Sequence, residues 1–273
     1  MKYRRELELY EKFLNEKELA KGTQEIYFRQ AREFLEYIGE KELKKELIIE
    51  YKNSLKEKEL AASTYNLYIT AVNNYLKFRG YEEYVVKTQK IQKRRNLNNL
   101  LKVEDYYRLL DHALKSGRRK YYYIMRTLAL TGIRVSELRY ITVESLEIKV
   151  FVAFNKGKVR EVCLPDDLVT ELKKYCEIAN ITKGTIFTGN NKKPITRNAV
   201  YQMMQILAEE TRISPKTVHP HNFRHLFAVT YMQHYSNIFE LADLLGHSNL
   251  EITRIYAVTT IEEKRKKLNQ LGL

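Results

Sequence analysis

Hydrophobic residues in the first part of the chain recur at intervals of three and four residues, and no proline occurs before Pro165. This spacing places apolar side chains on one face of a helix, so we expect this part to be largely helical. Thr23 and Ser63 are candidate N-caps of the second and fourth helices, and Gly39 and Gly80 are their candidate ends. Four short helices predict a compact bundle. The apolar stripes are Leu7, Tyr10, Phe13 and Leu14; Ile26, Ala31, Phe34, Leu35 and Ile38; Leu47, Ile48, Tyr51 and Leu55; and Leu67, Ala71, Tyr75 and Phe78.

Helical spacing also dominates the second part of the chain. Two helices are expected to end at Gly117 and Gly132, and a third to run from about Asp166 to Ala179. A fourth follows the N-cap Thr196, and a fifth begins near His221. The pattern as a whole predicts a mainly α fold with a small antiparallel β-sheet.

That sheet is predicted from residues 147–164, where apolar and polar positions alternate. The sequence Lys156-Gly-Lys158 interrupts the alternation, as a turn between two antiparallel strands does. We therefore expect a β-hairpin. The side chains expected to share its buried side are Ile148, Val150 and Val152 in the first strand, and Val162 and Leu164 after the turn.

A polar, basic stretch rich in Asn and Gln separates the two parts of the chain. A change of composition of this kind is typical of a linker. We expect residues 1–83 to form a helical domain, residues 84–100 a basic linker, and residues 101–273 a second domain that ends in a short tail helix.

The charge balance indicates a polyanionic partner. The 273 residues contain 48 Lys and Arg against 34 Asp and Glu, an excess of 14 positive charges. Nucleic acid is the expected partner, because an acidic membrane would favour basic residues on one long helix with an apolar opposite face. Runs of basic residues without acids are either solvated faces or a surface that follows phosphates. The candidate phosphate-binding residues are Lys87, Lys90, Lys93, Arg94, Arg95, Arg118, Arg119 and Lys120.

Three features bear on the compartment. The two cysteines, Cys163 and Cys176, form no closely spaced metal or redox pair. The first residues, MKYRRELELYEKF, lack the apolar core of a signal peptide, and no segment has the ~18 apolar residues of a membrane span. We expect a soluble protein of the cytoplasm.

Polar residues with specific chemistry interrupt the helical patterns at two places. Residues 218–257 contain His221-Asn-Phe-Arg224, then Leu-Leu-Gly-His247, and then Tyr256 nine positions later. Upstream, Arg134 follows a glycine by two residues and precedes Glu137 by three. Charged groups among apolar residues need partners. His221 and Arg224 lie one helical turn apart and can converge on one object.

These two blocks, in this order, resemble the signatures of the tyrosine recombinases of the phage-integrase family. The resemblance implies a SAM-like core-binding helical domain that clamps the DNA duplex, followed by a tyrosine-recombinase catalytic domain. It implies that Glu137 supports Arg134, although an Arg134–Glu137 pair with a purely structural role is the alternative. The implied catalytic residues are Arg134, Lys156, His221, Arg224, His247 and the nucleophile Tyr256.

The chemistry of such a site would be cleavage and rejoining of DNA strands through a 3′-phosphotyrosyl intermediate, without ATP, metal or another cofactor. Arg134 and Arg224 suit the non-bridging phosphate oxygens, because a guanidinium offers a planar fork of donors. Lys156 would protonate the leaving oxygen, with Lys158 as an open alternative. Tyr231 and Tyr235 are other candidate nucleophiles, but neither follows the Gly-His block.

His225 forms a His-x-x-x-His pair with His221, and such pairs can bind zinc at helical spacing. The pair lacks both the glutamate of the zinc-peptidase pattern and a nearby cysteine. We therefore interpret His225 as a packed supporting residue and expect no metal.

The expected partners are double-stranded DNA and other copies of this chain. The resemblance implies self-association on DNA, most simply a tetrameric synapse, in which the tail Ile261–Leu273 docks on a neighbouring subunit in trans. Element integration, chromosome dimer resolution and segment inversion stay open as roles. Two alternatives remain: a catalytically silent DNA-binding accessory protein, and a type IB topoisomerase-like enzyme that relaxes supercoils.

Overall fold

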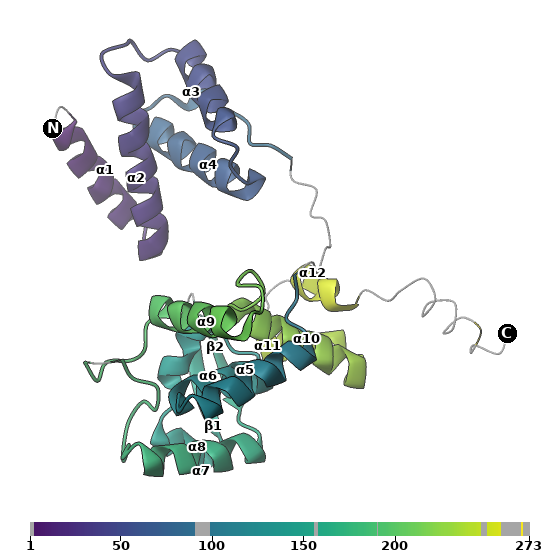
Figure 1. Ribbon diagram of the computed structural model, residues 1–273. Coiled ribbons are helices and arrows are strands. Elements are labelled where there is room, and N and C mark those ends of the chain that lie inside the picture. Colours follow the sequence, from purple (N-terminus) through teal and green to yellow (C-terminus); the bar gives the residue numbers. More distant parts are fainter. Residues whose placement is uncertain are drawn as a thin grey trace. The chain divides into compact units, whose positions relative to one another are not determined.

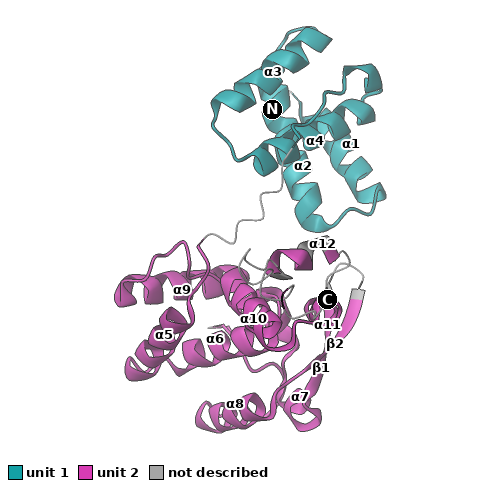
Figure 2. Cartoon of the chain, turned by 90° about the vertical axis from the view of Figure 1, so that its right-hand side faces the viewer, with its two compact units in different colours: residues 1–94 teal, residues 95–273 magenta. Residues whose placement is uncertain are grey.

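A computed structural model describes residues 3–90, 99–155, 158–189, 191–246, 250–257 and 269. The chain divides into two compact units, residues 1–94 and residues 95–273 (Figure 2). None of the helices in the described ranges is long and apolar enough to cross a bilayer.

The first unit is a bundle of four helices (Figure 1). Most members of the predicted apolar stripes face inward, and Tyr10, Phe34, Tyr51 and Tyr75 are among the fully or almost fully buried side chains. The prediction is wrong at Leu67, which is 37% exposed. Aromatic edges meet aromatic faces in this core, as in the T-shaped pair of Tyr10 and Tyr75. The elements are α1 (Arg4–Glu16), α2 (Lys21–Ile38), α3 (Lys45–Glu57), α4 (Ala62–Phe78) and the short 3₁₀ helix η1 (Glu82–Tyr84).

The predicted helix ends are correct in this unit, but the predicted N-caps are wrong. α2 ends at Gly39 with φ of 62°, and Gly80 follows α4 with φ of 77°. The Thr23 amide, however, already donates to the Ala20 carbonyl, and α4 begins at Ala62. Thr23 and Ser63 thus lie inside the first turn of their helices rather than at the N-cap, which is Ala20 in α2 and Ala61 in α4.

The second unit is mainly helical and contains a two-stranded antiparallel sheet, which confirms the predicted fold class. α6 and α10 pack against each other near its centre, and α5 packs on α6 and α9. The elements are α5 (Val103–Lys115), α6 (Arg119–Thr131), η2 (Val135–Tyr140), α7 (Val143–Ile148), β1 (Val150–Asn155), β2 (Lys158–Cys163), α8 (Asp166–Ile178), α9 (Arg197–Thr211), α10 (Pro220–Tyr235), α11 (Ile238–Leu245), α12 (Leu250–Thr253) and η3 (Arg254–Ala257). As predicted, the Thr196 side chain caps α9.

The hairpin exists, but its first strand faces the opposite way from the prediction. β1 and β2 pair from Val150 with Cys163 to Asn155 with Lys158, at one edge of the unit (Figure 2). Phe151 and Ala153 are buried, whereas Val152 is exposed. Alternation has a period of two, so a one-residue error in the starting position exchanges the two faces. The error arose at Ile148, which belongs to α7 and is 71% exposed.

Gly132 joins α6 to the segment that carries Arg134. It adopts a left-handed conformation with φ of 61°, and its amide donates to the Leu128 carbonyl. A Cβ atom at this position would lie 2.4 Å from Cδ1 of Phe227 on α10. Glycine is therefore required here for two reasons, the backbone conformation and the close packing of α10.

Gly132→Ala is expected to lower the free energy of unfolding by about 1–3 kcal/mol more than Gly117→Ala does. Both glycines have positive φ, at 61° and 72°, so both variants carry the backbone strain. Only Gly132 has an atom within 4 Å of the added Cβ. Urea denaturation of the two full-length variants measures the difference, and equal losses would show that the Phe227 contact is not limiting.

Candidate active site

Arg224 lies at the centre of the second unit, on α10. Its side chain is among the largest that are fully buried, with 2% of the residue exposed. One Nη donates to the Gly132 carbonyl over 2.7 Å and the other to the Leu245 carbonyl over 2.5 Å. The guanidinium therefore bridges the end of α6 and the end of α11.

Arg134 precedes η2 and pairs with Glu137, the carboxylate three residues on. The Arg134 backbone amide donates to Oε2 of Glu137 over 2.7 Å, and its guanidinium to Oε1 over 3.3 Å. Its other Nη lies 3.4 Å from the Gly246 carbonyl. The Glu137 side chain is 1% exposed, whereas that of Arg134 is 33% exposed. The Arg134 guanidinium is thus accessible to solvent, although the Glu137 carboxylate that holds it is buried.

Arg160 is a third arginine at this site, and we did not predict it from the sequence. It lies on β2 and donates to Oε2 of Glu137 over 2.9 Å and to the Leu244 carbonyl. The sequence carried a signal for it, because side chains two positions apart share one face of a strand. Arg160 lies two and four positions before the buried residues Val162 and Leu164, so its side chain points inward as theirs do. An arginine in such a place needs a buried partner.

Three consecutive carbonyls at the end of α11 accept one arginine each. Arg160 donates to Leu244, Arg224 to Leu245 and Arg134 to Gly246. The last carbonyls of a helix lack partners within the helix, and this end of the helix dipole attracts cations. A helix terminus thus gathers three guanidinium groups that come from three separate elements.

Gly246 makes this approach possible. It ends α11 in a left-handed conformation with φ of 62°, and a Cβ there would lie 2.6 Å from Cδ of Arg160. The predicted site residue His247 follows immediately. His247 and the hairpin residue Lys156 both lie outside the described residues, so their predicted roles still rest on the sequence motifs.

The charge at the centre of the site is unbalanced. Arg134 and Arg160 donate to one buried carboxylate, Glu137, whose charge also acts on Arg224. Burial, followed by the charges of Arg134 and Arg160, lowers the pKa of Arg224 to about 9, which still leaves it protonated at neutral pH. An anion between these groups would relieve their mutual repulsion, so the site favours a bound phosphate.

Tyr256 contacts His225, the residue after Arg224, and His225 in turn packs against His221. Its hydroxyl shares a hydrogen bond with Nδ1 of His225, and the His225 ring lies 4.2 Å from that of His221, centroid to centroid. Burial lowers the pKa of His225 to about 4, with further lowering from His221, His219 and Arg224. His225 is therefore a neutral imidazole at neutral pH, and it touches the predicted nucleophile, a contact that the sequence did not reveal.

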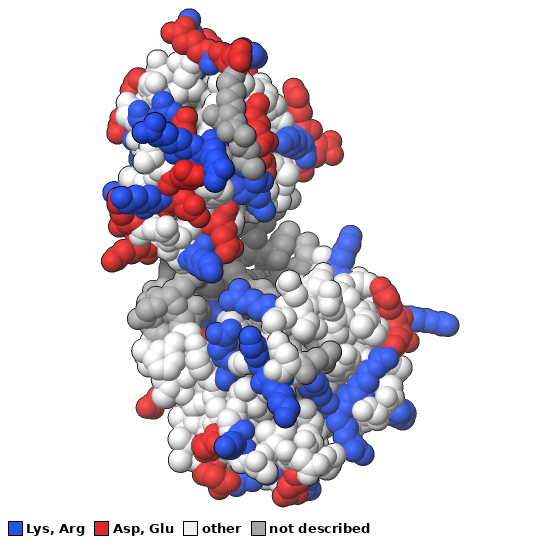
Figure 3. Space-filling view, turned by 90° about the vertical axis from the view of Figure 1, so that its left-hand side faces the viewer, with Lys and Arg blue, Asp and Glu red and all other residues white. Residues whose placement is uncertain are grey.

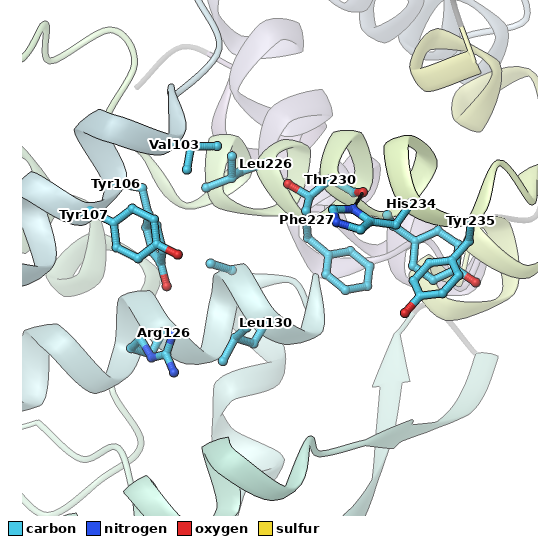
Figure 4. Close-up of a pocket in the computed structure, with 12 residues that line it drawn as sticks. Val103, Tyr106, Tyr107, Arg126, Leu130, Leu226, Phe227, Thr230, His234 and Tyr235 are labelled. Atoms are coloured by element: carbon cyan, nitrogen blue, oxygen red, sulfur yellow. Dashed lines mark hydrogen bonds between the residues drawn. The ribbon is translucent and has the colours of Figure 1, made fainter.

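Tyr256 is 8% exposed, and this burial raises the pKa of its hydroxyl to about 12, against an opposing effect of Arg224. Loss of its proton therefore requires a base or a nearby cation. The other two candidate nucleophiles, Tyr231 and Tyr235, instead line a cavity of about 370 Å³ among α5, α6 and α10 (Figure 4).

Some of the basic residues that we predicted to bind phosphate are exposed, and others are already paired within the protein. Arg118 forms an ion pair with Glu210, and Lys120 donates to the Thr188 carbonyl over 3.0 Å. Lys87, Lys90 and Arg119 are exposed. Lys93, Arg94 and Arg95 lie outside the described residues.

Further basic side chains, which were not among the predicted phosphate-binding residues, line two adjoining hollows in the second unit. Arg139 lines both hollows, whereas Arg197 lines only one of them and Lys193 only the other. On the face of this unit shown in Figure 3, Lys and Arg gather in a band, whereas basic and acidic groups intermingle on the first unit. This distribution marks the second unit as the stronger candidate for phosphate contact.

The phage integrase family model matches residues 99–263, and the chain belongs to this family. The chain is 27% identical over 199 residues to the tyrosine recombinase XerD of Staphylococcus saprophyticus, and 32% identical over 182 residues to a tyrosine recombinase of Pseudothermotoga lettingae. These matches cover 68% and 65% of this chain, and 66% and 62% of the relatives. The chain therefore spans just under two thirds of these curated relatives.

Solved structures share the fold at low sequence identity. The Tn1549 transposon integrase in complex with transposon right end DNA has a TM-score of 0.77 at 19% identity, over 98% of this chain and 99% of that one. A lambda integrase dimer bound to a COC′ core site has a TM-score of 0.74 at 17% identity, over 92% of this chain and 75% of that one. Both similarities show that this chain shares the fold of these proteins.

His225 is expected to remain neutral down to about pH 4, which makes the stability of the protein pH-dependent. The unfolded chain protonates this histidine near its ordinary pKa of 6.5 and the folded chain near 4, so the folded state binds fewer protons between these values. The free energy of unfolding should therefore fall as the pH drops from 6.5 toward 4. His225→Gln should weaken this dependence in urea denaturation at several pH values.

An NMR titration of the histidine ring protons checks the cause of the shift. Tyr256→Phe removes the hydrogen bond but retains most of the burial, which is the largest cause of the low pKa. The pKa of His225 should therefore stay well below 6.5 in this variant. A return to 6.5 would assign the shift to the hydroxyl contact instead.

Proposed function

We propose that this chain is a site-specific DNA recombinase that cleaves and rejoins DNA strands through a 3′-phosphotyrosyl intermediate. One observation carries the proposal: Arg134 and Arg224, far apart in the sequence, converge on the end of α11, while Tyr256 lies against His225 beside Arg224. Membership of the phage integrase family and the names of the relatives support the same reaction class.

In the proposed reaction, the scissile phosphate binds between Arg134 and Arg224. Their guanidinium groups donate to the non-bridging oxygens and offset the charge that develops in the transition state. The surplus of positive charge around Glu137 favours an anion here without a metal. His221, and by its motif His247, would donate further hydrogen bonds to the phosphate.

Tyr256 supplies the nucleophile. Its oxygen forms a bond to phosphorus while the bond from phosphorus to the 5′ oxygen breaks, and neutral His225 accepts the phenolic proton. The leaving 5′ oxygen takes a proton from Lys156, which the resemblance assigns to this step, or from Lys158. The phosphodiester is exchanged rather than hydrolysed, so rejoining needs no ATP.

The remaining parts of the chain would hold DNA and assemble the complex. The helical unit would act as the core-binding domain on the duplex, with exposed Lys87 and Lys90 beyond its bundle. We place the domains at residues 1–83 and 101–273, joined by a basic linker at residues 84–100. The active assembly would be a tetramer on DNA in the cytoplasm, with the tail helix docked in trans.

Tyr256→Phe is expected to abolish covalent attachment to DNA, because the variant lacks the attacking oxygen. The purified protein is incubated with DNA that flanks its own gene and then denatured, and protein-linked DNA is detected by electrophoresis. Tyr235→Phe is the matched control, since Tyr235 is 69% exposed and lies away from the arginine cluster. This control should form the adduct as the native protein does.

The alternatives give different results in the same experiment. Specific, salt-sensitive binding without any adduct would indicate the accessory DNA-binding protein. Relaxation of a supercoiled plasmid that lacks a target site, by the monomer, would indicate the topoisomerase-like enzyme.

Deletion of the residues after Lys264 is expected to weaken cooperative assembly on DNA while leaving single-site binding intact. The reason is that a tail docked in trans joins subunits but does not contact the first DNA site. Electrophoretic mobility shifts on DNA with one and two sites measure both quantities. Unchanged cooperativity would contradict docking of the tail.

A further inference from the structure

We propose that Arg160 is a positioning residue, which keeps the Arg134 guanidinium available to the scissile phosphate by occupying the carboxylate that would otherwise capture it. This inference rests on the proposed function. It adds a residue to the site that belongs to neither of the two sequence motifs, and it acts through Glu137 rather than on the substrate.

The contacts of Glu137 define this role. Its Oε2 accepts the Arg134 backbone amide over 2.7 Å and the Arg160 guanidinium over 2.9 Å. The Arg134 guanidinium has only the longer contact of 3.3 Å to Oε1. The stronger charge-assisted bond of this carboxylate therefore goes to Arg160.

Removal of Arg160 would leave Arg134 as the guanidinium that compensates the charge of Glu137. The Glu137 side chain is 1% exposed, so its charge cannot be compensated by water. Arg134 is the other guanidinium in contact with it and is free to pair with both carboxylate oxygens, the geometry that arginine and carboxylate favour. Such a pair would draw Arg134 inward and away from the phosphate.

Arg160 also joins the hairpin to the end of α11. It lies opposite Ala153 in the register, two residues after the start of β2, and donates to the Leu244 carbonyl. Its Cδ and Nε occupy the space beside Gly246 where a Cβ would stand. One side chain thus connects the strand after the Lys156 turn, the segment of Arg134 and the residue before His247.

A purely structural ion pair is the competing interpretation, and the chain provides a matched control for it. Arg126 on α6 pairs with Glu171 on α8 through two hydrogen bonds of 3.0 and 2.5 Å. The Arg126 side chain is 18% exposed, close to the 14% of Arg160. Arg126→Met therefore removes a similar pair without a contact to Arg134.

The experiment compares Arg160→Met, Arg160→Lys and Arg126→Met with the native protein in single-turnover cleavage of a target-site DNA. Each protein is given the ordinary phosphodiester and a methylphosphonate at the scissile position. A methylphosphonate replaces one anionic oxygen with a methyl group, so cleavage depends less on Arg134. A loss that comes from a misplaced Arg134 should therefore shrink on this substrate.

Arg160→Met is expected to cleave the phosphodiester on the order of 10²-fold more slowly at saturating DNA, with little change in DNA affinity. The loss should be much smaller on the methylphosphonate, and Arg160→Lys should recover part of the rate because it retains the charge. Arg126→Met should show the same relative rate on both substrates. An equal loss on both substrates for Arg160→Met, or no loss at all, would overturn the proposal.

A measurement without DNA separates this proposal from the proposed function. In protein labelled with ¹⁵N-arginine, the Arg134 signals are identified by their absence in Arg134→Lys. Arg160→Met should shift them and slow the rotation of the Arg134 guanidinium, because the side chain becomes fixed on Glu137. If the native protein forms no adduct, the proposed function fails, and an unchanged Arg134 signal would still refute the positioning role by itself.

Discussion

The second unit depends on the carbonyls at the C-terminal end of α11, which lack partners within the helix. The last carbonyls of a helix need donors from elsewhere, and here the donors are guanidinium groups from the residue before η2, from β2 and from α10. Each arginine is therefore fixed by a backbone atom, whose position depends on the helix rather than on a flexible side chain. This constraint converts three distant segments of sequence into one cationic site.

The same constraint explains why the site is electrostatically incomplete. Two of the three arginines donate to the buried carboxylate of Glu137, whereas Arg224 donates to the carbonyls of Gly132 and Leu245. Mutual repulsion of the three cations opposes folding in the absence of an anion, and a phosphate bound as we propose would offset part of that repulsion. The proposed affinity for phosphate and the fixed arginine geometry would thus have one physical origin.

Tyr256 and His225 form the second part of the site, and burial is the largest cause of the pKa shift of each side chain. It keeps the tyrosine protonated and the histidine neutral, so a proton acceptor waits beside the hydroxyl at neutral pH. The proposed nucleophile thus lies next to a proton acceptor without being ionised. Its activation then depends on the phosphate and on the cations around it.

The sequence by itself determined the mainly helical fold, the presence of the hairpin and the identity of the motif residues, because spacing and glycine positions act locally. Only the tertiary structure decided that the motif arginines meet at α11, that Arg160 joins them, and that His225 touches Tyr256. It also reversed the buried side of β1, where a one-residue offset left Val152 exposed and Phe151 buried. Contacts of this kind join residues up to 112 positions apart in the sequence, and local periodicity carries no information about such pairs.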